Sequence, residues 1–419
     1  MEKKVILVWF RNDLRLHDNE ILQEAIDKGS FIIPVYCFDP RYFTKNKFNN
    51  QNTGQKRAQF ILDSVQNLKD NLQKIGGDLL LCTGLPEEIL PTIAAKYDVD
   101  EVYHHREVAS RETQISEQVE AALWERKINL KHFIGHTLYH KEDLPFPIRD
   151  IPTSFNAFKK KIERESAVRK PLTAPEQITV PPHLEKSSVP TLVELGFIDN
   201  EQSANRLHGG EDEGIRQLRI IVDPKYSGLY DYTLLSPYIA NGCLSPILVY
   251  HTIHTSALSQ NKMRFTKISN RLLWRDYFRF MLKKYPNVFF KINAASKTAK
   301  YTDAELNDSI SWTEATTGIE IIDQSILKLK RTGNLPYHLR EILATYLLKE
   351  LRINWLVGAS FFEEHLIDFN PSTEYGYWAH VAGVGTSEKD NTTLGWQDLI
   401  SKYYPKGIAL DISEAEPTN

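Results

Sequence analysis

Hydrophobic residues in the first third of the chain form short apolar runs separated by longer stretches of helical pattern. The apolar runs are residues 5–10, 31–36, 78–82 and 101–104. The stretches that repeat apolar positions at three- and four-residue steps are residues 55–74, 86–97 and 110–126. Continuous apolar strands separated by helices are typical of a parallel sheet covered on both faces. The pattern predicts an α/β domain at residues 1–135 with a parallel five-stranded, Rossmann-like sheet.

The middle of the chain loses this alternation and becomes rich in proline. Eight prolines fall between residues 140 and 195, where only residues 154–165 have the pattern of a helix. Because proline lacks a backbone donor and fixes φ, repeated prolines interrupt long elements. We therefore expect a connector at residues 136–205 that runs over the surface.

Beyond the connector the strand pattern almost disappears and helical periodicity dominates. The predicted helices are residues 211–222, 245–256, 265–285, 318–331, 338–351 and 358–367. They indicate an all-α domain at residues 206–405, followed by a tail at 406–419 that is acidic from Asp411 onward. The predicted fold class is therefore an α/β N-terminal domain joined to an all-α C-terminal domain.

The composition sets limits on function without assigning one. The net charge is −3 and the isoelectric point is near 6.5, so contact with nucleic acid would need a local basic face. The three cysteines, Cys37, Cys82 and Cys243, form no CxxC pair, so we expect no metal site and a reducing compartment. No signal-peptide pattern and no bilayer-length apolar window occur, which predicts a cytoplasmic protein without membrane contact.

Two segments carry more specific chemistry. No G-x-G-x-x-G loop follows the first predicted strand; the highly charged segment 11–18 stands there instead. In the helix around residues 272–280, Trp274 lies next to Arg275. An indole beside a guanidinium suits a flat aromatic ligand that carries negative charge. The alternative is an amphipathic core helix with a solvated arginine.

Several longer motifs occur in a fixed order along the chain. They are residues 9–19, 137–140 with 143–146, 208–211, 235–246, 274–280 and 382–385. Together they resemble photolyases and cryptochromes, and several are closest to the DASH cryptochrome branch. The resemblance runs from about residue 3 to 405. It implies an antenna-like α/β domain, a long linker and an all-α domain that binds FAD in a folded conformation.

The resemblance implies a set of cofactor contacts in the helical domain. They are Tyr232, Thr233, Leu234, Leu235, Ser236, Arg275, Arg340, Asp368, Asn370 and Glu374. Arg275 matches an arginine near the flavin phosphates, and Arg340 and Asp368 match a charge pair that brackets the isoalloxazine ring. The hydroxyls of segment 232–236 open a predicted helix whose N-terminal amides favour a diphosphate. The alternatives are a plain N-cap before Pro237 and a purely structural salt bridge.

Two tryptophans match an electron-transfer chain of the family. Trp378 and Trp355 correspond to the members that pass electrons toward the light-excited flavin, although buried indoles at helix positions can also be plain core. At the third, outer position this sequence has Thr302, with Tyr301 beside it. Threonine cannot be oxidised at these potentials, so a tyrosine would have to take that place.

The residues that match the family's substrate contacts depart from its pattern. They are Arg271, Trp274, Tyr337, His338 and His380. Arg271 replaces a glutamate that binds the damaged pyrimidines, His380 replaces a stacking aromatic residue, and the 337–338 pair loses one phosphate-binding arginine. In the diphosphate segment, Leu234 replaces a basic residue.

Glu374 is the departure with the largest expected effect and joins the two tryptophans as a candidate catalytic residue. It stands where repair enzymes of this family have an asparagine that faces flavin N5. An ionised carboxylate about 4 Å from the anionic reduced flavin would cost about 4 kcal/mol at an effective dielectric near 20, unless it is protonated.

Glu107 matches a family position that binds a pterin antenna such as methenyltetrahydrofolate by a carboxylate hydrogen bond. An exposed loop acid is the alternative.

Three functions follow from these matches and departures. The first is a DASH-type deoxyribodipyrimidine photolyase, a carbon–carbon lyase that repairs cyclobutane dimers in DNA, including single strands in which a base is extruded at low cost. The second is a photosensory flavoprotein that acts through a signalling partner. The third is a binding scaffold without FAD. A monomer is expected in each case, and the altered site leaves enzyme activity open.

Overall fold

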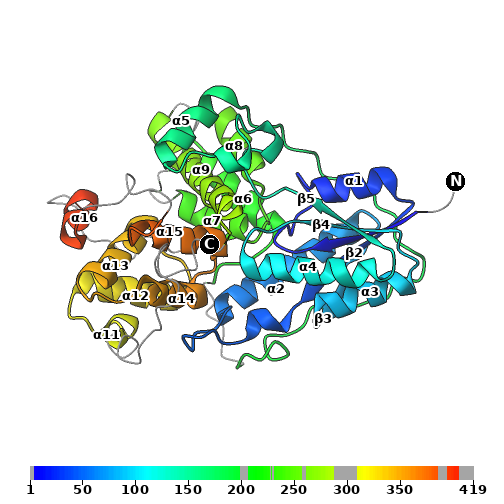
Figure 1. The fold of residues 1–419 in the computed structure, drawn as a ribbon, viewed down its shortest axis with the longest axis horizontal. Helices are drawn as coiled ribbons and strands as arrows, with labels where there is room; N and C mark the ends of the chain where they lie inside the picture. Colours follow the sequence, from blue (N-terminus) through cyan, green and yellow to red (C-terminus); the bar gives the residue numbers. More distant parts are fainter. Residues whose placement is uncertain are drawn as a thin grey trace.

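The computed structural model describes residues 4–198, 206–226, 228, 231–256, 261–286, 309–385 and 394–404. An α/β unit and a helical unit lie side by side, and the connector's helix α5 (Phe155–Glu165) lies at the top of the helical unit (Figure 1). This confirms the predicted fold class.

The α/β unit is built on a five-stranded parallel sheet. Its strands are β1 Val5–Phe10, β2 Phe31–Phe38, β3 Leu80–Thr83, β4 Glu101–His105 and β5 Asn129–Phe133, in the order β3-β2-β1-β4-β5. Side chains of β1 alternate between two cores. Ile6, Val8 and Phe10 pack with helices on one face, and Leu7 and Trp9 pack with helices on the other.

Four helices cover this sheet. They are α1 Glu20–Lys28, α2 Gln55–Lys74, α3 Pro86–Lys96 and α4 Ser110–Trp124. The apolar residues of α1 and α2 join the first core, and those of α3 and α4 join the second. The sequence pattern predicted α2, α3 and α4 to within two residues at each end. It did not single out α1 or β5, and β5 is an edge strand with several half-exposed positions that weaken the apolar run.

The connector contains little regular structure, as its prolines predicted. It has the short 3₁₀ turns η2 Lys141–Asp143 and η3 Ile148–Asp150 and the helix α5 Phe155–Glu165. Phe155, Phe158 and Ile162 form the buried face of α5. This face fixes α5 against the long helix α9 described next.

The helical unit contains ten described helices. They are α6 Glu211–Val222, α7 Asp231–Ala240, α8 Pro246–Thr255, α9 Lys262–Lys284, α11 Ile310–Thr313, α12 Glu320–Thr332, α13 Tyr337–Lys349, α14 Trp355–His365, α15 Pro371–Val381 and α16 Trp396–Tyr403. All six helices predicted from periodicity are present. Their packing leaves α7, α9, α13 and α15 around one buried region of the unit, which holds the candidate site.

The bounds of α7 rule out the alternative of a plain N-cap before Pro237. The helix begins at Asp231, so Ser236 and Pro237 lie within it and are not an N-cap followed by a first turn. Because Pro237 has no N–H, the carbonyl of Thr233 lacks its usual helical donor. Asn334 Nδ2 donates to that carbonyl instead at 3.2 Å.

The charged segment 11–18 joins the two units. Arg15 is buried and donates to the carbonyl of Gly242, while Glu211 of α6 accepts the backbone N–H groups of Leu16 and His17 at 2.8 and 3.0 Å. Gly242 has φ +76°, and a Cβ there would lie 1.8 Å from the carbonyl oxygen of Asn12. The segment therefore fixes the helical unit against the sheet.

Candidate functional site

The site centres on Arg340 of α13, which is fully buried. Its Nη2 donates to both oxygens of Asp368 at 2.9 and 2.7 Å, and its Nη1 donates to Glu374 Oε1 at 2.9 Å. The Nε group donates to the carbonyl of Leu335 at 2.8 Å, which fixes the plane of the guanidinium. Ser236 of α7 donates its hydroxyl to Asp368 Oδ2 at 2.6 Å. The predicted pair of Arg340 and Asp368 is present, and Glu374 joins it.

One guanidinium thus serves two buried carboxylates. Burial raises the pKa of Glu374 to about 7; Arg340 acts to lower it, and Asp368 acts to raise it. Burial also acts to lower the pKa of Arg340, but the charges of Asp368 and Glu374 outweigh it and raise that pKa. Glu374 is therefore the member of the cluster that changes protonation near neutral pH.

Aromatic rings form a wall beside this cluster. The guanidinium groups of Arg271 and Arg340 lie over the ring of Tyr337, 4.0 and 4.6 Å from its centroid. The rings of Tyr232 and Tyr377 have centroids 6.0 and 5.9 Å from that of Tyr337. Burial raises the pKa of all three phenols, that of Tyr232 to about 12, so each is a neutral hydroxyl at physiological pH.

Unpartnered polar atoms on α15 test whether this region fits a bound cofactor. Four buried atoms of the helix have no hydrogen-bond partner among the described residues: Thr373 Oγ1, Glu374 Oε2, Tyr377 Oη and Trp378 Nε1. Residues 373, 374, 377 and 378 lie one helical turn apart and so share one face. Buried polar groups normally have partners, because leaving one unpaired costs free energy. A polar ligand with donors and acceptors, as a flavin has, fits this face.

Other predicted cofactor residues are placed less simply. Arg275 is buried, which excludes the alternative of a solvated arginine, and its guanidinium donates to the carbonyls of His136 and Ile239. Its phosphate contact therefore stays a prediction. Thr233, Leu235 and Asn370 are buried and Leu234 is half-buried. Asn370 precedes α15 and accepts a hydrogen bond from Ser372 at 2.6 Å.

The predicted substrate residues fall into two groups. Trp274 is half-buried, stacks on Phe155 with ring centroids 3.7 Å apart, and lies 5.1 Å from the His380 ring. His338 lies apart from them, and its Nε2 is 2.7 Å from Tyr404 Oη. Burial, with Arg271 adding to it, lowers the pKa of His338 to about 4. His338 is therefore neutral at physiological pH and adds no charge for a phosphate.

The two predicted electron-transfer tryptophans lie at the interface of α14 and α15. Trp378 is fully buried, and its indole packs so closely on Gly358 that a Cβ there would lie 2.3 Å from the ring. Trp355 is buried three residues earlier on α14. Tyr301 and Thr302 lie outside the described residues.

Glu107 lies at the carboxyl end of β4 and is buried, so the alternative of an exposed loop acid is wrong. Its oxygens lie 3.0 Å from Arg279, 3.4 Å from His136 and 3.1 Å from the amide of Asn12. It also lines a cavity of about 490 Å³ between β4 and α9. The basic residues of that cavity are Arg106, Lys141, Arg279 and Lys283.

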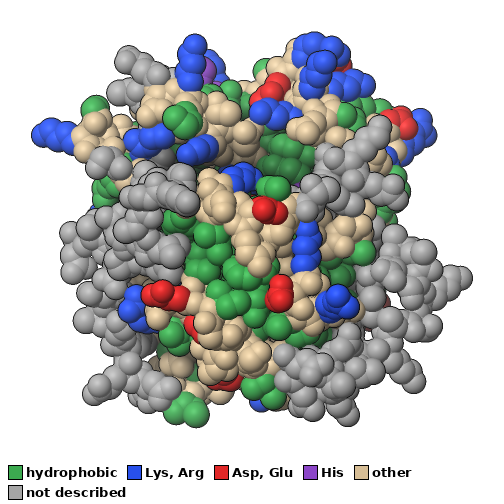
Figure 2. All heavy atoms as spheres, turned by 90° about the vertical axis from the view of Figure 1, so that its left-hand side faces the viewer, with side chains coloured by type: hydrophobic (Ala, Val, Ile, Leu, Met, Phe, Trp, Pro, Cys, Tyr) green, Lys and Arg blue, Asp and Glu red, His purple; other side chains and the backbone are tan. Residues whose placement is uncertain are grey.

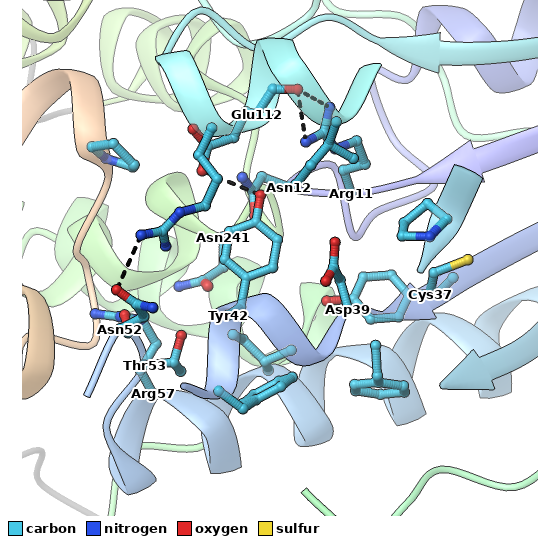
Figure 3. A pocket seen from close by; sticks show the side chains of 18 of the residues that line it. Arg11, Asn12, Cys37, Asp39, Tyr42, Asn52, Thr53, Arg57, Glu112 and Asn241 are labelled. Atoms are coloured by element: carbon cyan, nitrogen blue, oxygen red, sulfur yellow. Dashed lines mark hydrogen bonds between the residues drawn. The ribbon is translucent and has the colours of Figure 1, made fainter. Parts of the chain in front are cut away.

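A second, smaller cavity of about 120 Å³ lies between the α/β unit and α14. Arg11 and Tyr42 point toward Glu112 within it (Figure 3). Glu363 of α14 is another carboxylate of its lining.

Sequence reasoning missed three residues of these sites. Tyr377 forms part of the wall beside Glu374, and the pattern offered a signal because it lies between Glu374 and Trp378 on one helix. Arg279 carries the charge that binds Glu107, and it stands one helical turn after Arg275. Tyr375 contacts the Trp355 ring, with centroids 6.2 Å apart.

Comparisons with known proteins agree with this geometry. The family described as DNA photolyase matches residues 6–176, and the FAD binding domain of DNA photolyase matches residues 268–395. Cryptochrome DASH of Gloeobacter violaceus is 34% identical over 423 residues, covering 97% of this chain and 85% of that protein. The crystal structure of the Synechocystis cryptochrome has 33% identity and a TM-score of 0.84, and covers 97% of this chain and 88% of that one.

The chain belongs to the photolyase/cryptochrome family and carries its FAD-binding domain. Within that family it is a DASH-type protein. In the described parts of the chain no helix is long and apolar enough to cross a membrane.

Proposed function

We propose that this chain is a light-responsive FAD protein in which Glu374 restricts the repair of pyrimidine dimers. The observation that carries the proposal is the shared guanidinium of Arg340, which leaves Glu374 with a pKa of about 7. When bound, FAD supplies absorption of blue light and one-electron chemistry. Arg340 and Asp368 would hold one edge of the flavin, with Tyr232, Thr233 and Ser236 on the side of α7.

The chain's own groups would then control protonation around the cofactor. Glu374 Oε1 is held by Arg340, while Oε2 has no hydrogen-bond partner within the described residues and can donate or accept according to pH. Above a pH of about 7 the added negative charge disfavours a negatively charged flavin. Below that pH the carboxyl group is a neutral donor. Either state differs from the asparagine that repair enzymes of the family place here.

The contact face for DNA would be the side shown in Figure 2. Hydrophobic side chains gather near its centre, with Lys and Arg side chains along the upper edge, the side on which α5 lies in Figure 1. The basic residues of α5 are Lys159, Lys160, Lys161 and Arg164. Trp274 and His380 would meet an extruded base. Binding should be weak and salt-dependent, since each phosphate contact contributes about 0.9 to the logarithmic salt slope on duplex DNA.

A pterin antenna such as methenyltetrahydrofolate is proposed for the 490 Å³ cavity at Glu107. Ligand pockets commonly span about 300–1,000 Å³, and the cations that surround this one suit an anionic tail. Burial lowers the pKa of Lys283 to about 8, with Lys141 and Arg106 adding to the effect. An anionic ligand would offset the repulsion among these positive charges. The proposed setting is a cytoplasmic monomer whose partner is damaged DNA.

The test measures absorption and dimer repair together. We expect purified protein to show flavin bands, and Glu374→Asn to raise the rate of dimer splitting in single-stranded DNA by about tenfold, equivalent to about 1.4 kcal/mol of barrier. Adding Arg271→Glu should increase the rate further by restoring a base contact. Colourless protein that takes up no added FAD would contradict the proposal. Wild-type repair equal to that of the double variant would show that Glu374 does not restrict it.

A photosensory role is the second candidate, and the same observation favours it. A carboxyl group that changes charge near neutral pH beside the cofactor can couple light to conformation through Arg340 and Asp368. A double variant that keeps its light response but repairs no dimers would favour the photosensory role.

A further inference from the structure

The described part of the electron-transfer chain has a third aromatic neighbour. The ring of Tyr375 on α15 lies 6.2 Å from that of Trp355, at an interplanar angle of 74°. Its hydroxyl donates to Glu363 Oε2 at 2.8 Å. Tyr375 is half-buried, whereas Trp355 is buried and Trp378 fully so. Exposure therefore increases from Trp378 through Trp355 to Tyr375.

Phenol oxidation needs a proton acceptor, and this geometry supplies one. A tyrosine that loses an electron becomes a strong acid, so the electron leaves readily only where the proton can leave too. The bond from Tyr375 to a carboxylate meets that need. Glu363 also lines the 120 Å³ cavity, which gives the proton a route away from the tyrosine.

The indole of Trp312 also lies close to the electron-transfer chain, but it has neither partial exposure nor a proton acceptor among the described residues. The Trp312 ring is 6.4 Å from that of Trp378, and Trp312 is fully buried. Its indole N–H has no hydrogen-bond partner among the described residues. An oxidised Trp312 would hold both its charge and its proton in an apolar surrounding of Phe361 and Phe362. It is a poor end point for the electron chain.

We propose that Tyr375 is the outermost electron donor of the electron-transfer chain and that Glu363 accepts its phenolic proton. The inference rests on the proposed function, because the light-excited flavin is the one-electron oxidant. Trp355, oxidised after Trp378, takes one electron from Tyr375, and the O–H proton moves to Glu363. The products are neutral Trp355, a neutral tyrosyl radical and a protonated carboxyl group. A thiol in solution then returns one hydrogen atom to Tyr375, and Glu363 releases its proton to the cavity.

The charges around Glu363 fit this role. Burial raises its pKa, while the bond from Tyr375 and the nearby Arg111 and Arg57 act to lower it, and Glu112 acts to raise it. Arg111 Nη1 is 3.9 Å from Glu363 Oε1. The carboxylate is thus a stronger base than an exposed glutamate, which favours proton uptake. Radical formation should fall as acid protonates Glu363 in advance.

The chain offers a matched control. Tyr403 of α16 donates its hydroxyl to Glu341 Oε2 at 2.6 Å, so it is also a tyrosine paired with a glutamate in the helical unit. Its ring contacts His338, with centroids 5.4 Å apart. Tyr375→Phe and Tyr403→Phe therefore remove the same chemical group from two different surroundings.

The experiment records electron paramagnetic resonance spectra of flavin-loaded protein frozen during illumination, with ring-deuterated tyrosine to identify tyrosyl signals. We expect wild type and Tyr403→Phe to give a tyrosyl radical, and Tyr375→Phe to give a tryptophan radical instead. Glu363→Gln should lower the tyrosyl yield and remove its dependence on pH. Trp312→Phe should leave the yield unchanged.

Two results would overturn the inference alone. One is a tyrosyl signal that survives Tyr375→Phe in flavin-loaded protein. The other is loss of the signal in Tyr301→Phe or Tyr403→Phe with Tyr375 intact. Protein that binds no flavin would overturn the proposed function and this inference together, and the absorption spectrum taken before illumination distinguishes that case.

Discussion

Two buried glutamates, Glu107 and Glu374, show how the pKa of the same side chain can be shifted in opposite directions. Each is almost fully buried, and each contacts an arginine, Arg279 at 3.0 Å and Arg340 at 2.9 Å. Burial acts to raise both pKa values. For Glu107, Arg279 and then His136 outweigh it, and the pKa lies well below its usual value. For Glu374 burial prevails and the pKa is about 7.

The difference lies in how many carboxylates share each cation. Arg279 meets Glu107, whereas Arg340 gives two of its hydrogen bonds to Asp368 and one to Glu374. A bidentate pair takes most of the available attraction. Glu374 therefore keeps a larger share of its desolvation cost uncompensated. Arg340 and Asp368 thus form a structural ion pair, and Glu374 is the group that can titrate.

The largest expected effect follows from removing the shared cation. Arg340→Met would leave Asp368 buried without its partner, so we expect the free energy of unfolding to fall by about 3–5 kcal/mol. Urea denaturation measures it, and exposed Arg149→Met is the control, with an expected change below about 0.5 kcal/mol. A loss for Arg340→Met as small as that of the control would contradict the arrangement.

The next effect separates the two glutamates directly. At about pH 8, Glu107→Gln should cost about 3 kcal/mol, because it leaves the buried charge of Arg279 uncompensated. Glu374→Gln should cost less than about 1 kcal/mol or stabilise the fold, because Arg340 keeps Asp368. Equal losses in thermal or urea unfolding would remove the distinction between the two sites.

A smaller effect appears in the pH dependence of stability. The pKa of Glu374 is raised in the folded state, so the folded protein binds more protons than the unfolded chain between about pH 4.5 and 7. The contribution of Glu374 to stability is therefore fully present below about pH 4.5 and is lost as pH rises through about 7. The loss should approach about 3 kcal/mol. The difference between wild type and Glu374→Gln, measured at each pH, isolates it; a difference that does not change with pH would rule it out.

The sequence predicted the scaffold better than the site. Apolar periodicity located four of the five strands, the helices α2 to α5 and six helices of the helical unit, because burial of one face dictates spacing within each element. The resemblance to photolyases and cryptochromes identified Arg340, Asp368 and Glu374, which the fold brings together. Periodicity offered no means to foresee that Arg340 bonds both carboxylates, since that depends on the distance between α13 and α15.

Other features depended on contacts between distant segments. The exposed-loop alternative for Glu107 failed because Arg279, in α9, covers it. The N-cap alternative before Pro237 failed because Pro237 is tolerated inside α7, where Asn334 donates to the Thr233 carbonyl that would otherwise lack its helical donor. Such compensation is specific to the folded chain and leaves no periodic pattern.

The most direct test of the shared-guanidinium account is an infrared titration of Glu374 in wild type, with Glu374→Gln subtracted and Asp368→Asn as the comparison. In wild type we predict a protonated carboxyl band that disappears with a midpoint near pH 7. Asp368→Asn should lower that midpoint by about one unit or more, equivalent to about 1.4 kcal/mol, because Glu374 then has Arg340 to itself. A wild-type band that is already absent at about pH 5, or a midpoint that Asp368→Asn does not move, would contradict the account.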